Sequence, residues 1–228
     1  MALTSFFDWK KNIFEASLPQ DKETITKNIP SIYPYSDADT AVIEASKREP
    51  IFKNMLQEAL KRGANNKGYI LTDIKKLDSI QRKVDTKKKQ NPSFNVTNLT
   101  DILRGSIVTD NDHNLTEGVA KYIYNHYQVI SFEYKSSPKD KDRTGYHGTY
   151  HLDINLNGMP CEIQILTKAQ KSIKAVSDDA YKVSRVGQEV DPEIYSLLSR
   201  KFKKATMPPM KSTGRPQKST FKYNPEND

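Results

Sequence analysis

The feature that most limits how this chain can fold is a change in its hydrophobic pattern after Asn91-Pro92. Beyond that point the apolar residues come in short runs rich in β-branched side chains, which favour the half-buried surface of a strand. The runs cover residues 102–108, 129–134, 150–156 and 161–166. Asn157-Gly158 separates the last two runs, and this dipeptide is typical of a tight hairpin turn. We therefore predict four strands, of which the last two form an antiparallel pair.

Helical periodicity surrounds these strands. Phe52, Met55, Leu56, Ala59 and Leu60 recur at helical spacing, so we predict an amphipathic helix over residues 38–62 that ends at Arg62-Gly63. Further helices are predicted over residues 76–89, 114–126, 168–184 and 191–204. Helices placed between and after strands describe an α+β domain, a mixed β-sheet with flanking helices.

The length of 228 residues suits one catalytic core with additions at its ends. Prolines interrupt residues 17–37, so we expect residues 1–37 to hold a short first helix and an irregular connection. The core is then expected over residues 38–204. Residues 206–228 are basic and contain Pro208-Pro209, which predicts a flexible tail.

Charge and composition restrict the partners and the compartment. A net charge of +8 favours a polyanionic partner such as a nucleotide or a nucleic acid. The single cysteine, Cys161, excludes an internal disulfide and a cysteine-based zinc site, and favours the cytoplasm. No apolar run approaches the roughly 18 residues of a membrane span, so we expect no membrane association. The sequence also lacks a glycine-rich phosphate loop, a dinucleotide-binding fingerprint and a serine nucleophile elbow.

Two carboxylates are candidates for metal binding. Asp101 opens the first predicted strand, where its simpler role would be a cap. In the last predicted strand, alternation places Glu162, Gln164 and Leu166 on the face opposite Cys161, and an ordinary solvent-facing acid is the simpler interpretation of Glu162. If the two strands are neighbours, Asp101 and Glu162 can share Mg²⁺, because magnesium binds a few carboxylates together with substrate phosphate oxygens.

Basic residues gather in two segments. Lys75, Ser79 and Lys83 are four residues apart, which predicts one side of a helix starting near residue 75, with Arg82 beside them. Such a row either binds a polyphosphate or forms a solvated helix face. The second segment is a loop between two strands, which either binds a nucleotide through its cations and a stacking tyrosine or is merely a polar connection. Its residues of interest are Lys135, Lys139, Lys141, Arg143 and Tyr146.

In their order along residues 40–185, four segments resemble the synthetase domain of the RelA/SpoT family, and its small alarmone synthetases in particular. Residues 74–83 are similar to the family's Lys-x-x-x-Ser-Ile-x-x-Lys element, and residues 101–108 to its magnesium-binding strand. Pro138-Lys139 followed by Gly145-Tyr146 resembles the acceptor-nucleotide loop. Residues 162–167 resemble the Glu-x-Gln-x-Arg-Thr strand.

The resemblance implies a nucleotidyltransferase-like fold and an ATP-dependent pyrophosphokinase. Such an enzyme transfers the β,γ-pyrophosphate of ATP to the 3′-hydroxyl of a guanosine nucleotide, GDP or GTP, with Mg²⁺ as cofactor, and so makes the (p)ppGpp of the stringent response. The residues carried over for catalysis are Asp101, Glu162 and Gln164, the first two as metal ligands. Those carried over for ATP are Lys75, Ser79, Arg82, Lys83 and Arg104, and those for the acceptor are Lys135, Lys139, Lys141, Arg143, Tyr146 and His151.

The chain departs from the family's pattern at phosphate-binding positions. Asp73 stands where an arginine is expected, Arg104 is displaced by two residues, and Leu166 replaces the arginine of the last motif. The identity of the nucleotides used therefore stays open, and two alternative functions remain. One is a toxin-type member that acts on the 3′ end of tRNA or on adenosine nucleotides, with an antitoxin or immunity protein as partner. The other is a catalytically inactive relative that only binds nucleotide or RNA. A homo-oligomer is a further expectation.

Overall fold

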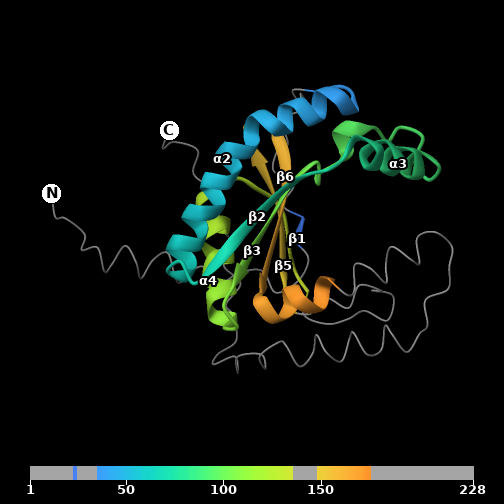
Figure 1. Ribbon diagram of the computed structural model, residues 1–228. Helices are drawn as coiled ribbons and strands as arrows, with labels where there is room; N and C mark the ends of the chain where they lie inside the picture. The colour runs from blue at the N-terminus through green and yellow to red at the C-terminus, as the bar shows by residue number, and fades with distance from the viewer. Residues whose placement is uncertain (1–22, 25–34, 136–147, 176–228) are drawn as a thin grey trace, which may run out of the picture.

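The computed structural model describes residues 23–24, 35–135 and 148–175 (Figure 1). The helices are α2 (Ala38–Ala64), α3 (Leu77–Lys88), the short 3-10 helix η1 (Val96–Asn98) and α4 (His113–His126). The strands are β1 (Glu23–Thr24), β2 (Gly68–Ile74), β3 (Leu103–Thr109), β4 (Val129–Tyr134), β5 (Tyr150–Leu156) and β6 (Met159–Thr167). One more helix begins at Lys168 and is described as far as residue 175.

The strands form one mixed sheet in the order β1-β4-β5-β6-β3-β2. Strands β3 and β6 pair in parallel, with Leu103 opposite Cys161 and Thr109 opposite Thr167. The other pairings are antiparallel. The predicted α+β class with a mixed sheet and flanking helices is thus confirmed. The strands predicted over residues 102–108 and 161–166 are direct neighbours, although a helix and two strands separate them in sequence.

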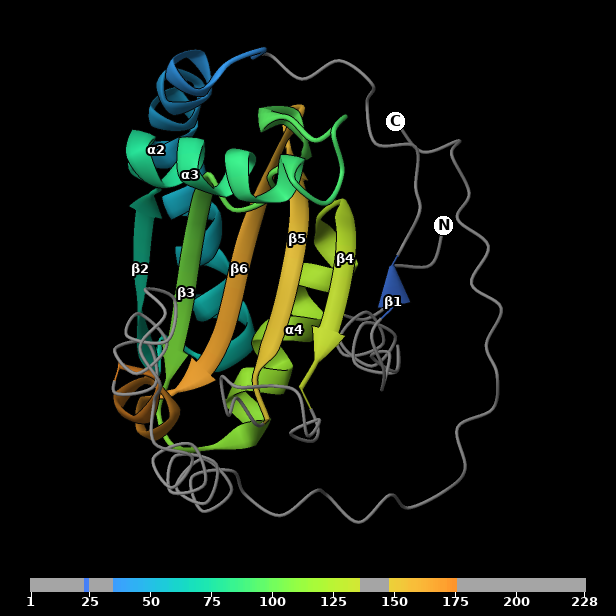
Figure 2. The same cartoon turned by 90° about the vertical axis from the view of Figure 1, so that its right-hand side faces the viewer.

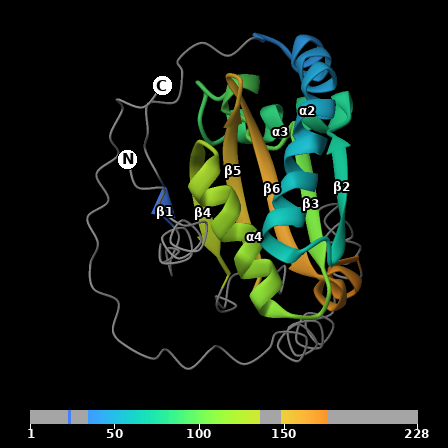
Figure 3. The same cartoon turned by 90° about the vertical axis from the view of Figure 1, so that its left-hand side faces the viewer.

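Helices α2 and α4 lie side by side over one face of the sheet (Figure 3). Alternate residues of the strands enter this layer, and Cys161, Ile163 and Ile165 of β6 are fully buried there. Helix α2 contributes Phe52 and Leu56 to the same core. On the opposite face, α3 crosses one end of the sheet, and the middle carries no helix among the described residues (Figure 2).

Two glycines set the spacing between α2 and α4. A Cβ atom on Gly118 would lie 2.4 Å from the carbonyl oxygen of Gly63, and one on Gly63 would lie 2.4 Å from Cα of Val119. Both clashes are with backbone, which cannot rotate out of the way. The sequence therefore needs glycine at both positions for the helices to pack at this distance.

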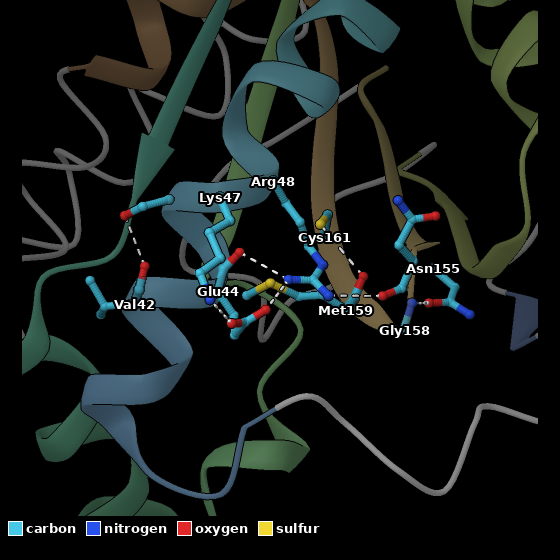
Figure 4. A network of polar contacts seen from close by, with 10 residues as sticks. Val42, Glu44, Lys47, Arg48, Asn155, Gly158, Met159 and Cys161 are labelled. Atoms are coloured by element: carbon cyan, nitrogen blue, oxygen red, sulfur yellow. Dashed lines mark hydrogen bonds and ion pairs between the residues drawn. The ribbon is translucent and has the colours of Figure 1, made fainter.

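The β5–β6 hairpin is held against α2. Asn157 and Gly158 have φ values of 50° and 82°, as expected for the predicted Asn-Gly turn. Arg48 of α2 pairs with Glu44 and donates a hydrogen bond from Nη2 to the carbonyl oxygen of Asn157 at 3.1 Å (Figure 4). These contacts fix the start of β6, the strand that carries Glu162.

Several expectations need correction. Strand β2 was not predicted; it is an edge strand whose residues are alternately exposed and half-buried, so it lacks a strong apolar run. Asp101 does not open the first strand of this group, since β3 begins at Leu103 and β2 precedes it in the chain. Strand β1 lies inside residues 17–37, where we expected only irregular structure, and pairs with β4. Residues 1–22, the predicted helix over 191–204 and the tail over 206–228 lie outside the described residues.

Candidate active site

Asp101 joins two lysines at one end of the sheet. Its Oδ2 atom accepts hydrogen bonds from Nζ of Lys75 at 2.5 Å and from Nζ of Lys83 at 2.8 Å. Lys75 directly follows β2, Lys83 lies on α3, and Asp101 lies two residues before β3. Three separate elements thus bring one acid and two bases together where β2 ends and β3 begins.

The electrostatics of this group favour a charged cluster with a net positive charge. Burial opposes ionisation of Asp101, but the hydrogen bonds and charges of the two lysines outweigh it, and its pKa lies below the ordinary value. Burial lowers the pKa of Lys75, an effect that the contact with Asp101 offsets in part. One carboxylate facing two ammonium groups leaves one positive charge over, which suits a site for a polyphosphate.

A row of polar side chains crosses the open face of the sheet next to this cluster. Directly opposing residues on neighbouring strands share a face. The register places Arg104 of β3 opposite Asp73 of β2 and also opposite Glu162 of β6. Asp153 of β5 lies on the other side of Glu162. Glu162 therefore faces away from the helix-covered core, as predicted, and it is half-buried rather than fully exposed.

Asp153 is a further candidate on this face that the sequence analysis did not single out. Its Oδ2 atom accepts a hydrogen bond from Ser131 Oγ at 2.8 Å. Burial raises the pKa of Asp153 to about 6, and the negative charges of Glu162 and Asp101 add to this effect. Asp153 therefore lies within electrostatic reach of both predicted metal ligands. The signal was present in β5, where His151, Asp153 and Asn155 alternate with buried leucine and isoleucine.

Gln164 lies beside Glu162 on the open face. Its Nε2 atom donates a hydrogen bond to Oε1 of Glu162 at 2.6 Å. The register also places Gln164 between Ser106 of β3 and His151 of β5. Gln164 is thus in a position to orient the Glu162 carboxylate, and His151 lies in the same row as Gln164 on this face. Leu166, which we expected on this face, is buried.

Lys135, the residue of the acceptor loop that is described, lies at the far end of the sheet from Asp101. Lys135 follows β4, and its backbone N–H donates to the carbonyl oxygen of Thr149 at 3.0 Å. Tyr150, at the start of β5, is opposite Ile165, whereas Leu103 is opposite Cys161. Four residues of β6, about 13 Å, separate these levels. Lys139, Lys141, Arg143 and Tyr146 lie outside the described residues.

The predicted row of phosphate-binding residues on a helix needs correction. Helix α3 begins at Leu77, so Lys75 precedes it, and the extended backbone of Lys76 separates the two. Lys75 and Lys83 nevertheless meet, because both contact Asp101. Ser79 is half-buried on α3, and Arg82 is exposed there.

Asp101 offers one carboxylate oxygen of the kind that binds a magnesium ion. Oδ1 of Asp101 is buried and accepts no hydrogen bond from the described residues. A free, buried carboxylate oxygen is a suitable ligand for a hard cation. Among the described residues, no group of three or more His, Cys, Asp or Glu side chains could hold a metal ion alone. A magnesium ion held at Asp101 would therefore need oxygen ligands from a substrate as well.

The sequence matches the profile of the region found in RelA/SpoT proteins over residues 72–185, half of the chain. This range contains Lys75, Lys83, Asp101, Glu162 and Gln164. The protein belongs to the RelA/SpoT family. A comparison with curated proteins gave no significant match.

Solved structures confirm the fold. The small alarmone synthetase 1 from Bacillus subtilis bound to its product pppGpp superposes with a TM-score of 0.56 and 16% identity, covering 73% of this chain and 90% of that one. A GTP pyrophosphokinase family protein from Streptococcus pneumoniae gives 0.53 and 16%, covering 73% and 84%. The small alarmone synthetase 2 from Bacillus subtilis gives 0.52 and 17%, covering 74% and 89%. In the part of the chain that the structure describes, no helix has the length and hydrophobicity needed to cross a membrane.

Proposed function

We propose that this protein is an ATP-dependent nucleotide pyrophosphokinase that transfers the β,γ-pyrophosphate of ATP to the 3′-hydroxyl of a guanosine nucleotide. The observation that carries the proposal is the meeting of Lys75, Lys83 and Asp101 beside the strand that bears Glu162, in a chain of the RelA/SpoT family. The pppGpp bound to the Bacillus subtilis relative supports a guanosine product.

The lysine end of the sheet is the proposed site for the ATP phosphates. Lys75 and Lys83 now share one carboxylate oxygen, and each ammonium group has further donors for phosphate oxygens. Their charge would stabilise the phosphates as negative charge shifts to the leaving AMP. Lys83 is one-third exposed at its side chain, so a ligand can reach it from solvent.

Glu162 is the proposed group that receives the proton of the acceptor hydroxyl. The 3′-oxygen attacks the β-phosphorus, the bond from that phosphorus to the α-phosphate oxygen breaks, and AMP leaves. Gln164 holds one carboxylate oxygen of Glu162 through its 2.6 Å hydrogen bond, which leaves the other oxygen for the hydroxyl. The acceptor would extend from Glu162 toward His151 and Lys135, the end of the sheet where the predicted acceptor loop is attached.

Asp101 and Glu162 are the proposed ligands of Mg²⁺. When bound, the ion would neutralise charge on the phosphate oxygens during the transfer. The free Oδ1 atom of Asp101 supports this assignment, because its other oxygen is already used by the lysines. Glu162 lies on β6 and Asp101 lies two residues before the adjoining strand β3, so the fold holds their backbones at a fixed separation.

The test is incubation of the full chain with Mg²⁺ and ATP labelled at the β-phosphate, with GDP, GTP, ADP and bulk tRNA as separate acceptors. Label on GDP or GTP, with release of AMP, supports the proposal. Label confined to tRNA, or to ADP, replaces it with the toxin-type alternative. If the protein binds ATP but labels no acceptor, the chain is a nucleotide-binding relative without transfer activity.

A further inference from the structure

Arg104 lies beside the lysine cluster, but its guanidinium is directed toward Asp73. The register places Arg104 between Asp73 on β2 and Glu162 on β6. Its Nε and Nη2 atoms both donate to Oδ2 of Asp73, at 2.8 and 2.5 Å. The side chain therefore extends to the edge strand and is engaged by an acid there.

Arg104 belongs to the same electrostatic neighbourhood as the two lysines. Its positive charge contributes to the lowered pKa of Lys75. Lys75, Lys83 and Arg104 thus form a group of three cations, which Asp101 and Asp73 partly neutralise. The two acids differ in setting, since the side chain of Asp101 is 12% exposed and that of Asp73 is 59% exposed. A pair as exposed as Asp73–Arg104 contributes little stability, about 0 to 1 kcal/mol, and is easily broken.

A polyphosphate can take the place of Asp73. Guanidinium groups bind carboxylate and phosphate in similar planar geometries, so the two anions compete for the same donors. The Nε and Nη2 donors of Arg104, the edge that can bind a phosphate through two parallel hydrogen bonds, are therefore open to phosphate only after the guanidinium leaves Asp73. The cost of that exchange reduces the affinity for the phosphate ligand.

From this geometry we propose that Asp73 sets the affinity for ATP by competing with its phosphates for Arg104. The inference rests on the proposed function in one respect, the placement of the ATP phosphates at the lysine end of the sheet. Asp73 is a positioning residue here, because it acts through Arg104 and not on the substrate. Neutralising Asp73 frees the guanidinium of Arg104 and leaves the contacts of Lys75 and Lys83 with Asp101 unchanged.

Binding of a non-hydrolysable α,β-methylene analogue of ATP to the full chain tests the proposal. Isothermal titration in the presence of Mg²⁺ would compare the wild type with Asp73→Asn. We expect about two- to fivefold tighter binding, the range that corresponds to breaking an exposed ion pair. In turnover assays the KM for ATP should fall by the same factor while kcat is unchanged.

Glu58→Gln is the matched control. Glu58 also forms an exposed pair with an arginine, Arg62, at 2.7 Å on α2, on the other side of the sheet. The substitution changes the net charge of the protein by the same amount as Asp73→Asn. We expect Glu58→Gln to bind the analogue as the wild type does. If both variants bound it more tightly, the effect would be one of overall charge, and the proposal would be overturned.

The double variant Asp73→Asn/Arg104→Gln distinguishes competition of Asp73 for Arg104 from direct repulsion between Asp73 and the phosphates. Without the guanidinium, the Asp73 substitution should no longer tighten binding relative to Arg104→Gln alone. A gain that persists would show that Asp73 acts directly on the phosphates, and the competition would be rejected. Unchanged binding in Asp73→Asn, with only a loss of stability, would mean that the pair merely supports the sheet edge.

These outcomes are independent of transfer activity. If no acceptor is labelled but Asp73→Asn binds the analogue more tightly, the inference holds and the proposed function fails. If neither the wild type nor the variant binds the analogue, the inference itself is rejected.

Discussion

Asp153 lies directly opposite Glu162 in the antiparallel β5–β6 pair, so two carboxylates face each other on the open side of the sheet. Opposed like charges destabilise a sheet. Ser131 donates one hydrogen bond to Asp153, and Gln164 donates one to Glu162. This unfavourable arrangement lies within electrostatic reach of Asp101, in the region where the pyrophosphoryl transfer is proposed.

Stability should therefore depend on pH through Asp153. Its pKa is raised from 3.8 to about 6, so between these values the native state binds more protons than the unfolded state. The protonated Asp153 side chain therefore contributes to stability below pH 4, and this contribution is lost as the pH rises through 6. The free energy of unfolding then falls by about 2 to 3 kcal/mol at most. We expect Asp153→Asn to raise the free energy of unfolding at pH 8 and to change it less at pH 5. Urea denaturation with a chelator at both pH values measures this, and equal effects at the two pH values would contradict it.

Asp101→Asn should abolish turnover and also lower stability. The substitution leaves Lys75, whose side chain is only 11% exposed, without its ionic partner, and removing one partner of a buried pair costs about 3 to 5 kcal/mol. Adding Lys75→Met should recover part of the unfolding free energy but none of the activity. Asp110→Asn, in the exposed pair with Lys168, is the control and should change the free energy of unfolding by less than about 1 kcal/mol.

Glu162→Gln should remove activity without unfolding the protein. The amide cannot accept the acceptor's proton, and general-base groups contribute about 10² to 10⁴ in rate. Because Glu162 is half-buried on the open face, the fold should tolerate the isosteric change. Circular dichroism would check the fold and the labelling assay would check turnover. A variant that retained half of the wild-type rate would exclude Glu162 as the base.

Tyr146→Ala should weaken binding of the acceptor nucleotide more than binding of ATP. If the ring stacks on a purine, the loss is about 1 to 3 kcal/mol. Titration with the acceptor and with the ATP analogue, separately, measures the two effects. Equal affinity of wild type and variant for the acceptor would remove Tyr146 from the acceptor site.

Gly118→Ala should destabilise the protein although alanine is the better helix former. The added methyl would lie 2.4 Å from the carbonyl oxygen of Gly63, so α4 must move away from α2. Overpacking of this kind costs about 1 to 3 kcal/mol. Thermal denaturation is the measurement, and Asn54→Ala on the exposed side of α2 is a control in which no contact is created. A Gly118→Ala protein as stable as the wild type would contradict the close approach.

The sequence alone determined the elements whose signals are local. Strand alternation placed Cys161 and Glu162 on opposite faces, the Asn157-Gly158 dipeptide predicted the hairpin, and helical periodicity located α2 to within two residues at its end. Four ordered motifs also predicted the RelA/SpoT family. Each of these depends on neighbouring residues, which the sequence displays directly.

Only the tertiary structure decided which side chains meet. The contact of Lys75 and Lys83 with Asp101 and the pairing of Arg104 with Asp73 depend on strand order and register. The opposition of Asp153 to Glu162, by contrast, follows from the two-residue turn of the β5–β6 hairpin. Lys75 was placed on a helix because its spacing matched one, whereas its contact with Asp101 arises because β2 ends beside the start of β3. For strands that no tight turn connects, order and register depend on packing between residues distant along the chain, which a local pattern does not display.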